Sequence, residues 1–376
     1  MNDPDSGQTL PLPAGVRSRW IDNGHGLNMH VLEAGDAQQQ RPLVVLLHGF
    51  PELAYTWRKV MPSLAEAGYH VVAPDQRGYG LTTGWQATYD GDLAPFRQLS
   101  LVWDVVGLVT ALGYRAAEAV VGHDIGSPVA AYCALARPDM FRSVALMSAP
   151  FAGPPVPGAE ISRDLDAELA VLDTPRKHYQ HYFRGPDAAA HMDSPPQGLH
   201  NFLRAYFHVK SADWPGNDPF PLADGSAGEL ARMPYYYVME RDRTMPETVA
   251  DEMPSATRIS HCQWLPDHQL AVYTQMFQAT GFQGGLQWYR AFAEPATTRE
   301  LRQFSGQTLD VPSCFIAGEK DWGIYQSPGR FEHMQHSACS QMRRCTLIEG
   351  AGHWVQQEQP QAVTEELLAF LSDISR

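Results

Sequence analysis

The stretch Ala119-Val120-Val121-Gly122-His123-Asp124-Ile125-Gly126 decides the fold predicted for this chain. Its apolar start is typical of a buried strand, and an alanine-rich segment typical of a helix follows over 127–137. The Gly-x-Asp-x-Gly turn between them has the form of a nucleophile elbow, in which a reactive side chain sits at a strained strand-to-helix corner. Asp124 stands where many enzymes carry a serine, and the helix N-terminus behind it favours the ionised carboxylate. Asp124 is therefore the predicted nucleophile.

Short apolar runs on both sides of this elbow alternate with helix-length segments near 53–67, 100–112 and 127–137. Runs of four or five apolar residues bounded by Gly, Pro or Asp are typical of buried parallel strands. Their alternation with helices predicts an α/β protein with a doubly wound, mostly parallel sheet. The predicted strands are Met29–Leu32, Leu43–Leu47, Val71–Ala73, Ala119–Val121, Val144–Met147, Cys314–Ala317 and Cys345–Ile348.

The alternation stops after Pro150 and returns only at Cys314. Residues 151–300 are rich in proline, histidine and aromatic residues, with helical stretches but no strand–helix rhythm. A last amphipathic helix is predicted over 360–374. The sequence therefore predicts one core formed by residues 1–150 and 301–376, with a mainly helical domain, 151–300, inserted after the sixth strand.

The charge balance excludes several classes of partner. The chain has 28 Lys and Arg against 42 Asp and Glu, a net charge of −14. A surface this acidic repels phosphate backbones and anionic lipids, so we expect no nucleic-acid partner. No stretch reaches the roughly 18 apolar residues needed to span a bilayer, so we expect no membrane insertion. The oligomeric state is left open, with a homodimer among the options.

The cysteines and histidines give no metal pattern. The five cysteines are odd in number and contain no Cys-x-x-Cys pair, which predicts neither a disulfide framework nor a zinc site. Five histidines between residues 178 and 208 lack ligand spacing with a companion cysteine or carboxylate. We therefore expect no metal and a reducing, cytoplasmic location.

A carboxylate nucleophile needs a base and an acid that orients the base, and both follow later in the chain. Cys345–Ile348 leads into Gly350-Ala351-Gly352-His353, and Cys314–Ala317 leads into Gly318-Glu319-Lys320-Asp321. Open α/β sheets place their sites at these carboxyl ends of the strands. His353 is the predicted base and Asp321 its acid, with Glu319 as the alternative acid.

Two backbone N–H groups are predicted to form an oxyanion hole. His48-Gly49-Phe50-Pro51 follows the strand Leu43–Leu47, and the loop in this place supplies one donor, from Phe50. The second donor comes from Ile125, directly after the nucleophile. The isomer of the Phe50–Pro51 peptide bond is left open, because proline permits both.

Five motifs recur along the predicted core: HGFPE (48–52), PDQRGYG (74–80), GHDIG (122–126), GEKD (318–321) and GHWVQ (352–356). Together they resemble the soluble epoxide hydrolase branch of the α/β-hydrolase fold. The resemblance implies that the insertion is a helical cap and that the chain converts an epoxide and water into a vicinal diol through an aspartyl ester, without a cofactor. The aromatic and Met content of the insertion suggests an apolar pocket, so we expect a small apolar epoxide and water as the reactants.

The resemblance further implies two cap tyrosines that bind the epoxide oxygen. Tyr179, within HYQHYF (178–183), matches the first, and Tyr289, within GFQGGLQWYR (281–290), matches the second. A phenol with a pKa near 10 stays protonated at neutral pH and can donate to the developing alkoxide. Tyr182 lies three residues after Tyr179 and is the alternative for the first position.

The chain departs from the family pattern in two places. Many relatives carry Trp after the nucleophile, and Ile125 here changes one wall of the pocket. Residues 211–256 have no clear counterpart, and their role is left open between narrowing a tunnel, forming a lid and serving an interface.

Four residues within the motif segments are assigned to substrate binding: His48, Pro51, Trp288 and Trp354.

Two other functions remain as alternatives. A haloalkane or haloacid dehalogenase uses the same Asp-His-Asp set, but it needs halide-binding donors that the Ile125 side chain lacks. A non-catalytic ligand receptor on the same fold would be expected to lose a catalytic residue, and none of those predicted is missing. Which epoxide is used, and with which selectivity, is not predicted by the sequence.

Overall fold

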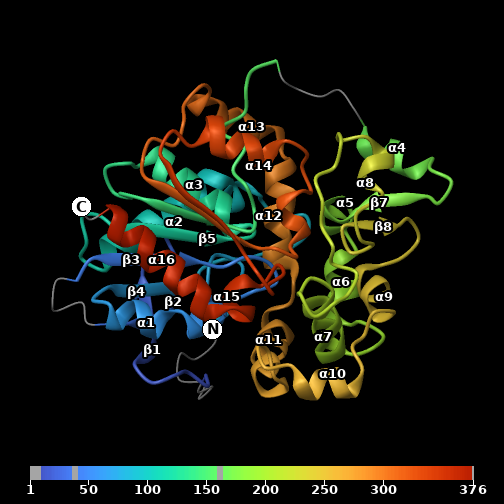
Figure 1. Cartoon of the computed structure of the whole chain (residues 1–376), viewed down its shortest axis with the longest axis horizontal. Helices are drawn as coiled ribbons and strands as arrows, with labels where there is room; N and C mark the ends of the chain where they lie inside the picture. Colours follow the sequence, from blue (N-terminus) through green and yellow to red (C-terminus); the bar gives the residue numbers. More distant parts are fainter. Residues whose placement is uncertain (1–9, 36–40, 159–163, 375–376) are drawn as a thin grey trace.

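The computed structural model describes residues 10–35, 41–158 and 164–374, and an eight-stranded sheet forms its centre (Figure 1). The strand order is β1-β2-β4-β3-β5-β6-β9-β10. β2 is antiparallel to both of its neighbours, and all other pairs are parallel. The predicted mostly parallel α/β sheet is thus confirmed. The strands are β1 Val16–Asp22, β2 Asn28–Ala34, β3 Leu43–Leu47, β4 His70–Pro74, β5 Ala119–His123, β6 Val144–Met147, β9 Ser313–Gly318 and β10 Met342–Ile348.

Helices cover both faces of this sheet because successive strand side chains point to opposite sides. In β3, Leu43 and Val45 join the apolar layer under α2 and α3, whereas Val44 and Leu46 join the layer under α1 and α16. The core helices are α1 Met61–Glu66, α2 Gln98–Ala111, α3 Gly126–Ala136, α14 Arg330–His333, α15 Val355–Glu358 and α16 Pro360–Ile374. Short 3₁₀ turns are Ala54–Lys59, Ala94–Phe96, Arg302–Phe304 and Trp322–Ile324, and Met334–Ala338 forms a π-turn.

The seven predicted strands are all present, with bounds within three residues of the prediction. The helix expected over 53–67 is split, because the 3₁₀ turn Ala54–Lys59 ends where α1 begins with Met61 and Pro62. β1 was not predicted. It pairs with β2 at the edge of the sheet, and most of its side chains are exposed.

The chain leaves the sheet after β6 and returns at β9, and most of the helices between stand beside the sheet (Figure 1). A two-stranded sheet of β7 Arg176–His178 and β8 Val238–Glu240, which the sequence did not predict, lies among them. The helices are α4 Leu165–Ala170, α5 Tyr179–Arg184, α6 Ala188–Asp193, α7 Leu199–Val209, α8 Ala227–Leu230, α9 Met245–Ala250, α10 Ala256–His261, α11 Asp267–Thr280, α12 Gln283–Ala293 and α13 Pro295–Leu301.

One close backbone contact seats α12 on the core. A Cβ atom added to Gly284 would overlap the carbonyl oxygen of Gly78 and lie 2.7 Å from its Cα. Gly78 itself has a φ of +91°, which favours glycine. The indole N–H of Trp288 donates to the carbonyl of Arg77 at 2.9 Å. These contacts fix the rotation of α12 and therefore the direction of Tyr289.

In the part of the chain that the structure describes, no helix combines the length and the apolar character that a membrane crossing requires. The same residues contain no group of three or more His, Cys, Asp or Glu side chains placed to hold a metal ion.

Candidate active site

Asp124 occupies a tight turn between β5 and α3. Its φ of +52° lies in the left-handed region, which is uncommon for a residue with a side chain. Neighbouring backbone passes so closely that a Cβ at Gly126 would lie 2.9 Å from the carbonyl oxygen of Leu47, and one at Gly49 would lie 2.7 Å from Oδ1 of Asp124. Gly49 and Gly126 therefore leave room for the strained backbone of Asp124, whose carboxylate projects from the end of β5.

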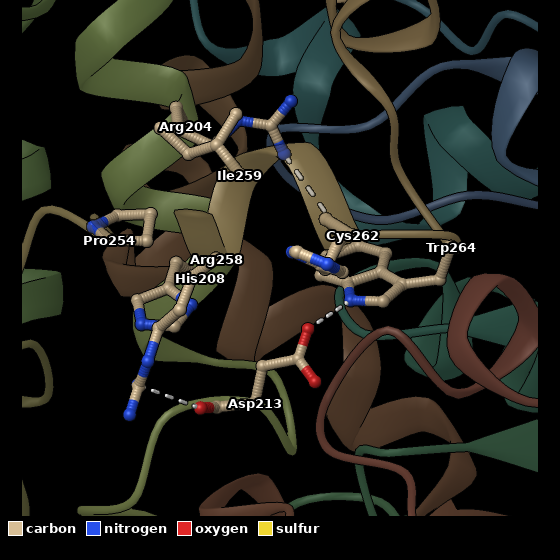
Figure 2. A pocket seen from close by; sticks show the side chains of 9 residues that line it. Arg204, His208, Asp213, Pro254, Arg258, Ile259, Cys262 and Trp264 are labelled. Atoms are coloured by element: carbon tan, nitrogen blue, oxygen red, sulfur yellow. Dashed lines mark hydrogen bonds between the residues drawn. The ribbon is translucent and has the colours of Figure 1, made fainter. Parts of the chain in front are cut away.

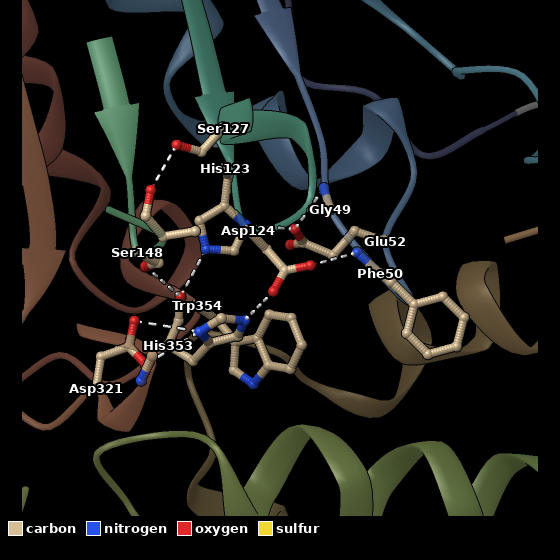
Figure 3. Close-up of polar contacts among 12 residues, drawn as sticks. Gly49, Phe50, Glu52, His123, Asp124, Ser127, Ser148, Asp321, His353 and Trp354 are labelled. Atoms are coloured by element: carbon tan, nitrogen blue, oxygen red, sulfur yellow. Dashed lines mark hydrogen bonds and ion pairs between the residues drawn. The ribbon is translucent and has the colours of Figure 1, made fainter. Parts of the chain in front are cut away.

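The Asp124 carboxylate is held from two sides (Figure 3). The backbone N–H of Phe50 donates to Oδ1 at 3.0 Å, and Nε2 of His353 lies 3.1 Å from Oδ2. Burial opposes ionisation, but the contact with His353 and the positive charges of His353 and Lys210 outweigh it, and the pKa of Asp124 is held well below its usual range. A carboxylate in this state is ionised throughout the physiological pH range, as a carboxylate nucleophile must be.

His353 stands between two carboxylates. Its Nδ1 lies 3.1 Å from both carboxylate oxygens of Asp321, and the backbone N–H of Gly323 fixes Asp321 from behind at 2.7 Å. Burial and Lys210 lower the pKa of His353, but the two carboxylates raise it above its ordinary value. Among the described residues, Nε2 has no acceptor aligned with its N–H direction. Nε2 is therefore available to a water molecule beside Asp124. Glu319, the alternative acid, is exposed.

The two predicted oxyanion donors flank the nucleophile. Phe50 is buried, and its N–H already contacts Oδ1 of Asp124. Ile125 directly precedes α3 as its N-cap residue, in helical conformation with a φ of −67°. The first N–H groups of a helix have no partner within the helix. The Phe50 N–H is thus placed beside the carboxyl group, and the role of the Ile125 N–H stays a prediction.

Two tyrosines from the inserted segment face each other over this carboxylate. Tyr179 opens α5 and Tyr289 lies within α12, and their ring centroids are 6.2 Å apart. Both rings contact Phe183, and the Tyr289 ring also contacts Phe50 at 5.6 Å between centroids. Burial, and then the negative charge of Asp124, raise the pKa of both phenols well above 10. Both hydroxyls are therefore protonated at neutral pH.

Tyr182 points elsewhere. Its hydroxyl lies 3.2 Å from Nδ1 of His191, and its ring stacks on the His191 ring. The Tyr179 hydroxyl instead lies 3.3 Å from the side-chain oxygen of Gln326 and 3.1 Å from the side-chain nitrogen of Gln180. Of the two alternatives for the first cap tyrosine, the structure brings only Tyr179 to Tyr289.

The two tryptophans assigned to substrate binding make hydrogen bonds inside the protein. The indole N–H of Trp354 donates to the carbonyl of Phe207 at 2.8 Å, and its ring packs edge-on against His353. The indole N–H of Trp288 donates to Arg77, as described above. Both side chains are fully buried. Trp354 thus supports His353, and Trp288 holds α12 against the core. Contact of either side chain with a substrate stays a prediction.

His48 and Pro51 lie within the oxyanion loop. Nδ1 of His48 is 2.8 Å from the carbonyl oxygen of Gly49, and Nε2 accepts from the backbone N–H of Gln76 at 3.1 Å. Both ring nitrogens are thus used to shape the loop. The Phe50–Pro51 peptide bond is cis, which the sequence left open. A substrate contact of either side chain also stays a prediction.

Lys210, which the sequence analysis did not single out, is a buried cation whose charge acts on both Asp124 and His353. Its ammonium lies 5.3 Å from the ring centroids of both Tyr237 and Trp354 and 5.7 Å from that of Tyr206. Lys210 directly follows α7, and the only local signal is a positive charge after the mainly apolar and aromatic run Ala205–Val209. A lysine after a helix is normally a solvated surface residue, so the sequence pattern alone gives no reason to select it.

A buried carboxylate connects the oxyanion loop to the loop of the base. Oε2 of Glu52 lies 2.6 Å from Nδ1 of His123, whose Nε2 lies 2.7 Å from the carbonyl oxygen of His353 (Figure 3). The Gln356 side chain donates to Oε1 of Glu52 at 3.0 Å. Glu52 and His123 belong to recognised motifs, but their mutual contact appears only in the folded chain. This network holds both loops against the end of β5.

Comparisons with known proteins agree with this geometry. A family model described as the alpha/beta hydrolase fold matches residues 42–219. Over 362 residues, the chain is 35% identical to epoxide hydrolase A of Mycobacterium tuberculosis, covering 95% of this chain and 97% of that protein. It is 32% identical over 359 residues to epoxide hydrolase B of the same organism, covering 94% and 98%. A solved epoxide hydrolase from an endophytic Streptomyces superposes with a TM-score of 0.75 at 30% identity, covering 96% and 97%.

Proposed function

Since the chain belongs to the epoxide hydrolase family of the α/β-hydrolase fold, we propose that it converts an epoxide and water into a vicinal diol through an ester on Asp124. One observation carries this proposal: the ionised Asp124 carboxylate lies 3.1 Å from Nε2 of His353 and faces two protonated tyrosines across the site. A nucleophile, a base and a pair of acids are thus gathered in one buried space.

The first step is ring opening by Asp124. One carboxylate oxygen attacks an epoxide carbon, the bond from that carbon to the ring oxygen breaks, and an alkyl ester forms. Tyr179 and Tyr289 hold the ring oxygen, and one of them gives it a proton as charge develops. Burial raises the pKa of both phenols. The tyrosinate left after proton transfer is therefore a strong base and regains a proton before the next cycle.

The second step is hydrolysis of the ester. Nε2 of His353 takes a proton from water, and the water oxygen attacks the carbonyl carbon of the Asp124 ester. The N–H groups of Phe50 and Ile125 stabilise the oxyanion, and Asp321 stabilises the imidazolium. Collapse breaks the acyl carbon–oxygen bond, and the proton on His353 passes to the departing alcohol oxygen. The Asp124 carboxyl group formed in this way still carries the second proton of the water, and this proton passes to the tyrosinate. The diol leaves, the carboxylate and the phenol are restored, and one water is consumed.

The walls of the site favour an apolar epoxide. Phe50 contacts the rings of Phe183, Phe282 and Tyr289, with centroids 5.1 to 6.1 Å apart. Aromatic surfaces of this kind bind apolar groups and exclude bulk water, which strengthens the hydrogen bonds to the epoxide oxygen. We therefore assign a small apolar epoxide and water as the partners of the reaction.

The rival functions differ in measurable ways. Halide release from a haloalkane, without turnover of epoxides, would favour the dehalogenase. Binding of an epoxide without any turnover would favour a receptor. Neither has an observation in its favour: the Ile125 side chain offers a halide no donor, and the three predicted triad residues are in contact.

The His353→Gln variant tests the proposal, with Asp124→Asn as the matched control. Without its base, His353→Gln is expected to form the ester but not hydrolyse it, so its intact mass rises by the mass of one epoxide. The Asp124→Asn variant should not gain this mass. Full steady-state turnover by either variant would overturn the mechanism.

A cytoplasmic location is proposed from the cysteine pattern, and all five cysteines are free thiols. A homodimer stays a prediction.

A further inference from the structure

A cavity of about 200 Å³ lies in the helical insertion (Figure 2), and none of its lining residues belongs to the proposed catalytic set. Arg204 and His208 line it from α7, and Tyr206 lies midway between them in the sequence. Residues two apart project from nearly opposite sides of a helix, whereas residues four apart share a face. Tyr206 contacts Lys210 and Trp354 beside the active site. The cavity therefore opens on the other face of α7.

The polar lining consists mainly of arginine and histidine side chains, in a chain whose net charge is −14. Two arginines and two histidines face the cavity against a single carboxylate, that of Asp213. The Asp213 side chain accepts from the indole N–H of Trp264 at 2.8 Å, and its backbone carbonyl accepts from Arg258 at 3.4 Å (Figure 2). The nine lining residues are Arg204, His208, Asp213, Pro254, Arg258, Ile259, His261, Cys262 and Trp264.

Two of these side chains have unused hydrogen-bonding capacity. His208 is only 7% exposed, and its ring makes no hydrogen bond with any described residue. Arg204 is more deeply buried, at 3% exposed, and it donates to the Leu265 carbonyl and to Asp267 at 2.8 Å each. Its Nε has no partner among the described residues. Buried donors without partners are rare in folded proteins, and a bound group is one reason for them.

We propose that this cavity binds a small oxyanion, a phosphate or carboxylate group. Guanidinium groups donate paired hydrogen bonds to such oxygens, and an imidazole adds a third donor from another direction. A metal ion does not fit, because two arginines would repel it. A space of about 200 Å³ is below the usual range for drug-sized ligands, so it suits the anionic head of a molecule whose remainder stays in solvent.

Calorimetric titration with inorganic phosphate, and separately with acetate, tests the proposal. The matched variants are Arg258→Met, which removes an exposed cavity residue, and Arg232→Met, which removes an exposed arginine bound to Glu229 outside the cavity. The wild-type chain and Arg232→Met should bind with saturation, and Arg258→Met should bind about tenfold more weakly or worse. The imidazole nitrogen resonances of His208 should shift with the same saturation curve.

The outcomes separate the sources of the anion. Saturation with phosphate alone assigns a phosphate group, and saturation with acetate as well extends the site to carboxylates. Absence of saturable binding of either ion would overturn the proposal. Binding that is unchanged in Arg258→Met and leaves the His208 resonances in place would also overturn it, because the ion would then lie elsewhere. None of these readouts depends on epoxide turnover.

Discussion

The backbone carbonyl of Lys210 accepts a hydrogen bond of 2.8 Å from the backbone N–H of His353. The residue after α7 is thus joined directly to the proposed base. Glu358 adds a second tie, because its carboxyl group accepts from the backbone N–H groups of Ala212 at 2.7 Å and Gly352 at 3.0 Å. Residues at the start of the 211–256 stretch, whose role the sequence left open, therefore help to hold the loop of the base.

Replacing Lys210 with methionine should move the acid limb of the pH–rate profile to higher pH. Burial and Lys210 lower the pKa of His353, whereas Asp321 and Asp124 raise it. Removing the ammonium raises this pKa further, and His353 must be neutral to accept a proton from water. At pH 6.5, ester hydrolysis should slow on the order of threefold to tenfold, since one pKa unit is a factor of ten. Lys210→Arg keeps the charge and should keep the profile. An unshifted acid limb in Lys210→Met would refute this electrostatic role.

Phenylalanine at Tyr179 and Tyr289 should slow ring opening. Each single variant removes one donor to the epoxide oxygen, and the double variant removes the acid altogether. General acid catalysis contributes roughly 10²- to 10⁴-fold, so the double variant should lose on the order of that factor in the rate of ester formation. Rapid-quench mass spectrometry measures this step. Tyr182→Phe is the control and should match the wild type. A larger loss in Tyr182→Phe than in Tyr179→Phe would reverse the assignment.

Replacing Gly284 with alanine should displace α12 from its contact with the core. The added Cβ would overlap the backbone of Gly78, and overpacking of this kind costs about 1–3 kcal/mol of unfolding free energy. Tyr289 moves with the helix, so the rate of ester formation should fall as well. Gly228→Ala, also in a helix, has nothing within 4 Å of its new Cβ and should be neutral or slightly stabilising. Urea denaturation of the two variants makes the comparison, and equal midpoints would contradict it.

Glu33 should make the fold sensitive to acid. Burial raises its pKa, but the hydrogen bond with His70 and the charges of Arg19 and Arg17 lower it from 4.5 to about 2. A depressed pKa contributes stability that is present above pH 4.5 and lost as the pH falls towards 2. Glu33→Gln should therefore be less stable than the wild type at pH 6, with the difference shrinking by pH 3. Denaturant midpoints at both pH values measure it, with the exposed Glu319→Gln as control. A difference that does not change with pH would disprove the linkage.

The sequence predicts the buried strands well because each one is a short, uninterrupted apolar run. β1 escapes this criterion because only Val16 and Ile21 of its seven residues are buried. The β7–β8 pair is missed for a related reason: each strand has three residues, and the β7 side chains are only partly buried. Edge and short strands depend on pairing with a distant segment, and local apolar pattern does not report that pairing.

The proposed catalytic residues could be located because each belongs to a local motif at a strand end. Asp124 lies in the elbow, and Asp321 and His353 follow the last two strands of the core sheet. The structure brings all three together, and their roles in turnover stay predictions. Lys210 could not be found in this way, because only the packing of α7 brings it to His353. The same packing gives Trp354 its internal hydrogen bond, which a motif does not reveal.

Single-turnover hydrolysis of a simple aryl epoxide in ¹⁸O-water tests the covalent role of Asp124 most directly. With enzyme in excess, water attacks the carboxyl carbon of the ester, so the label should enter the side chain of Asp124 and the first diol should carry only ¹⁶O. Mass spectrometry of the diol and of the peptide containing Asp124 reads both. If the first diol carries ¹⁸O and Asp124 stays unlabelled, water attacks the epoxide directly and the ester mechanism is wrong.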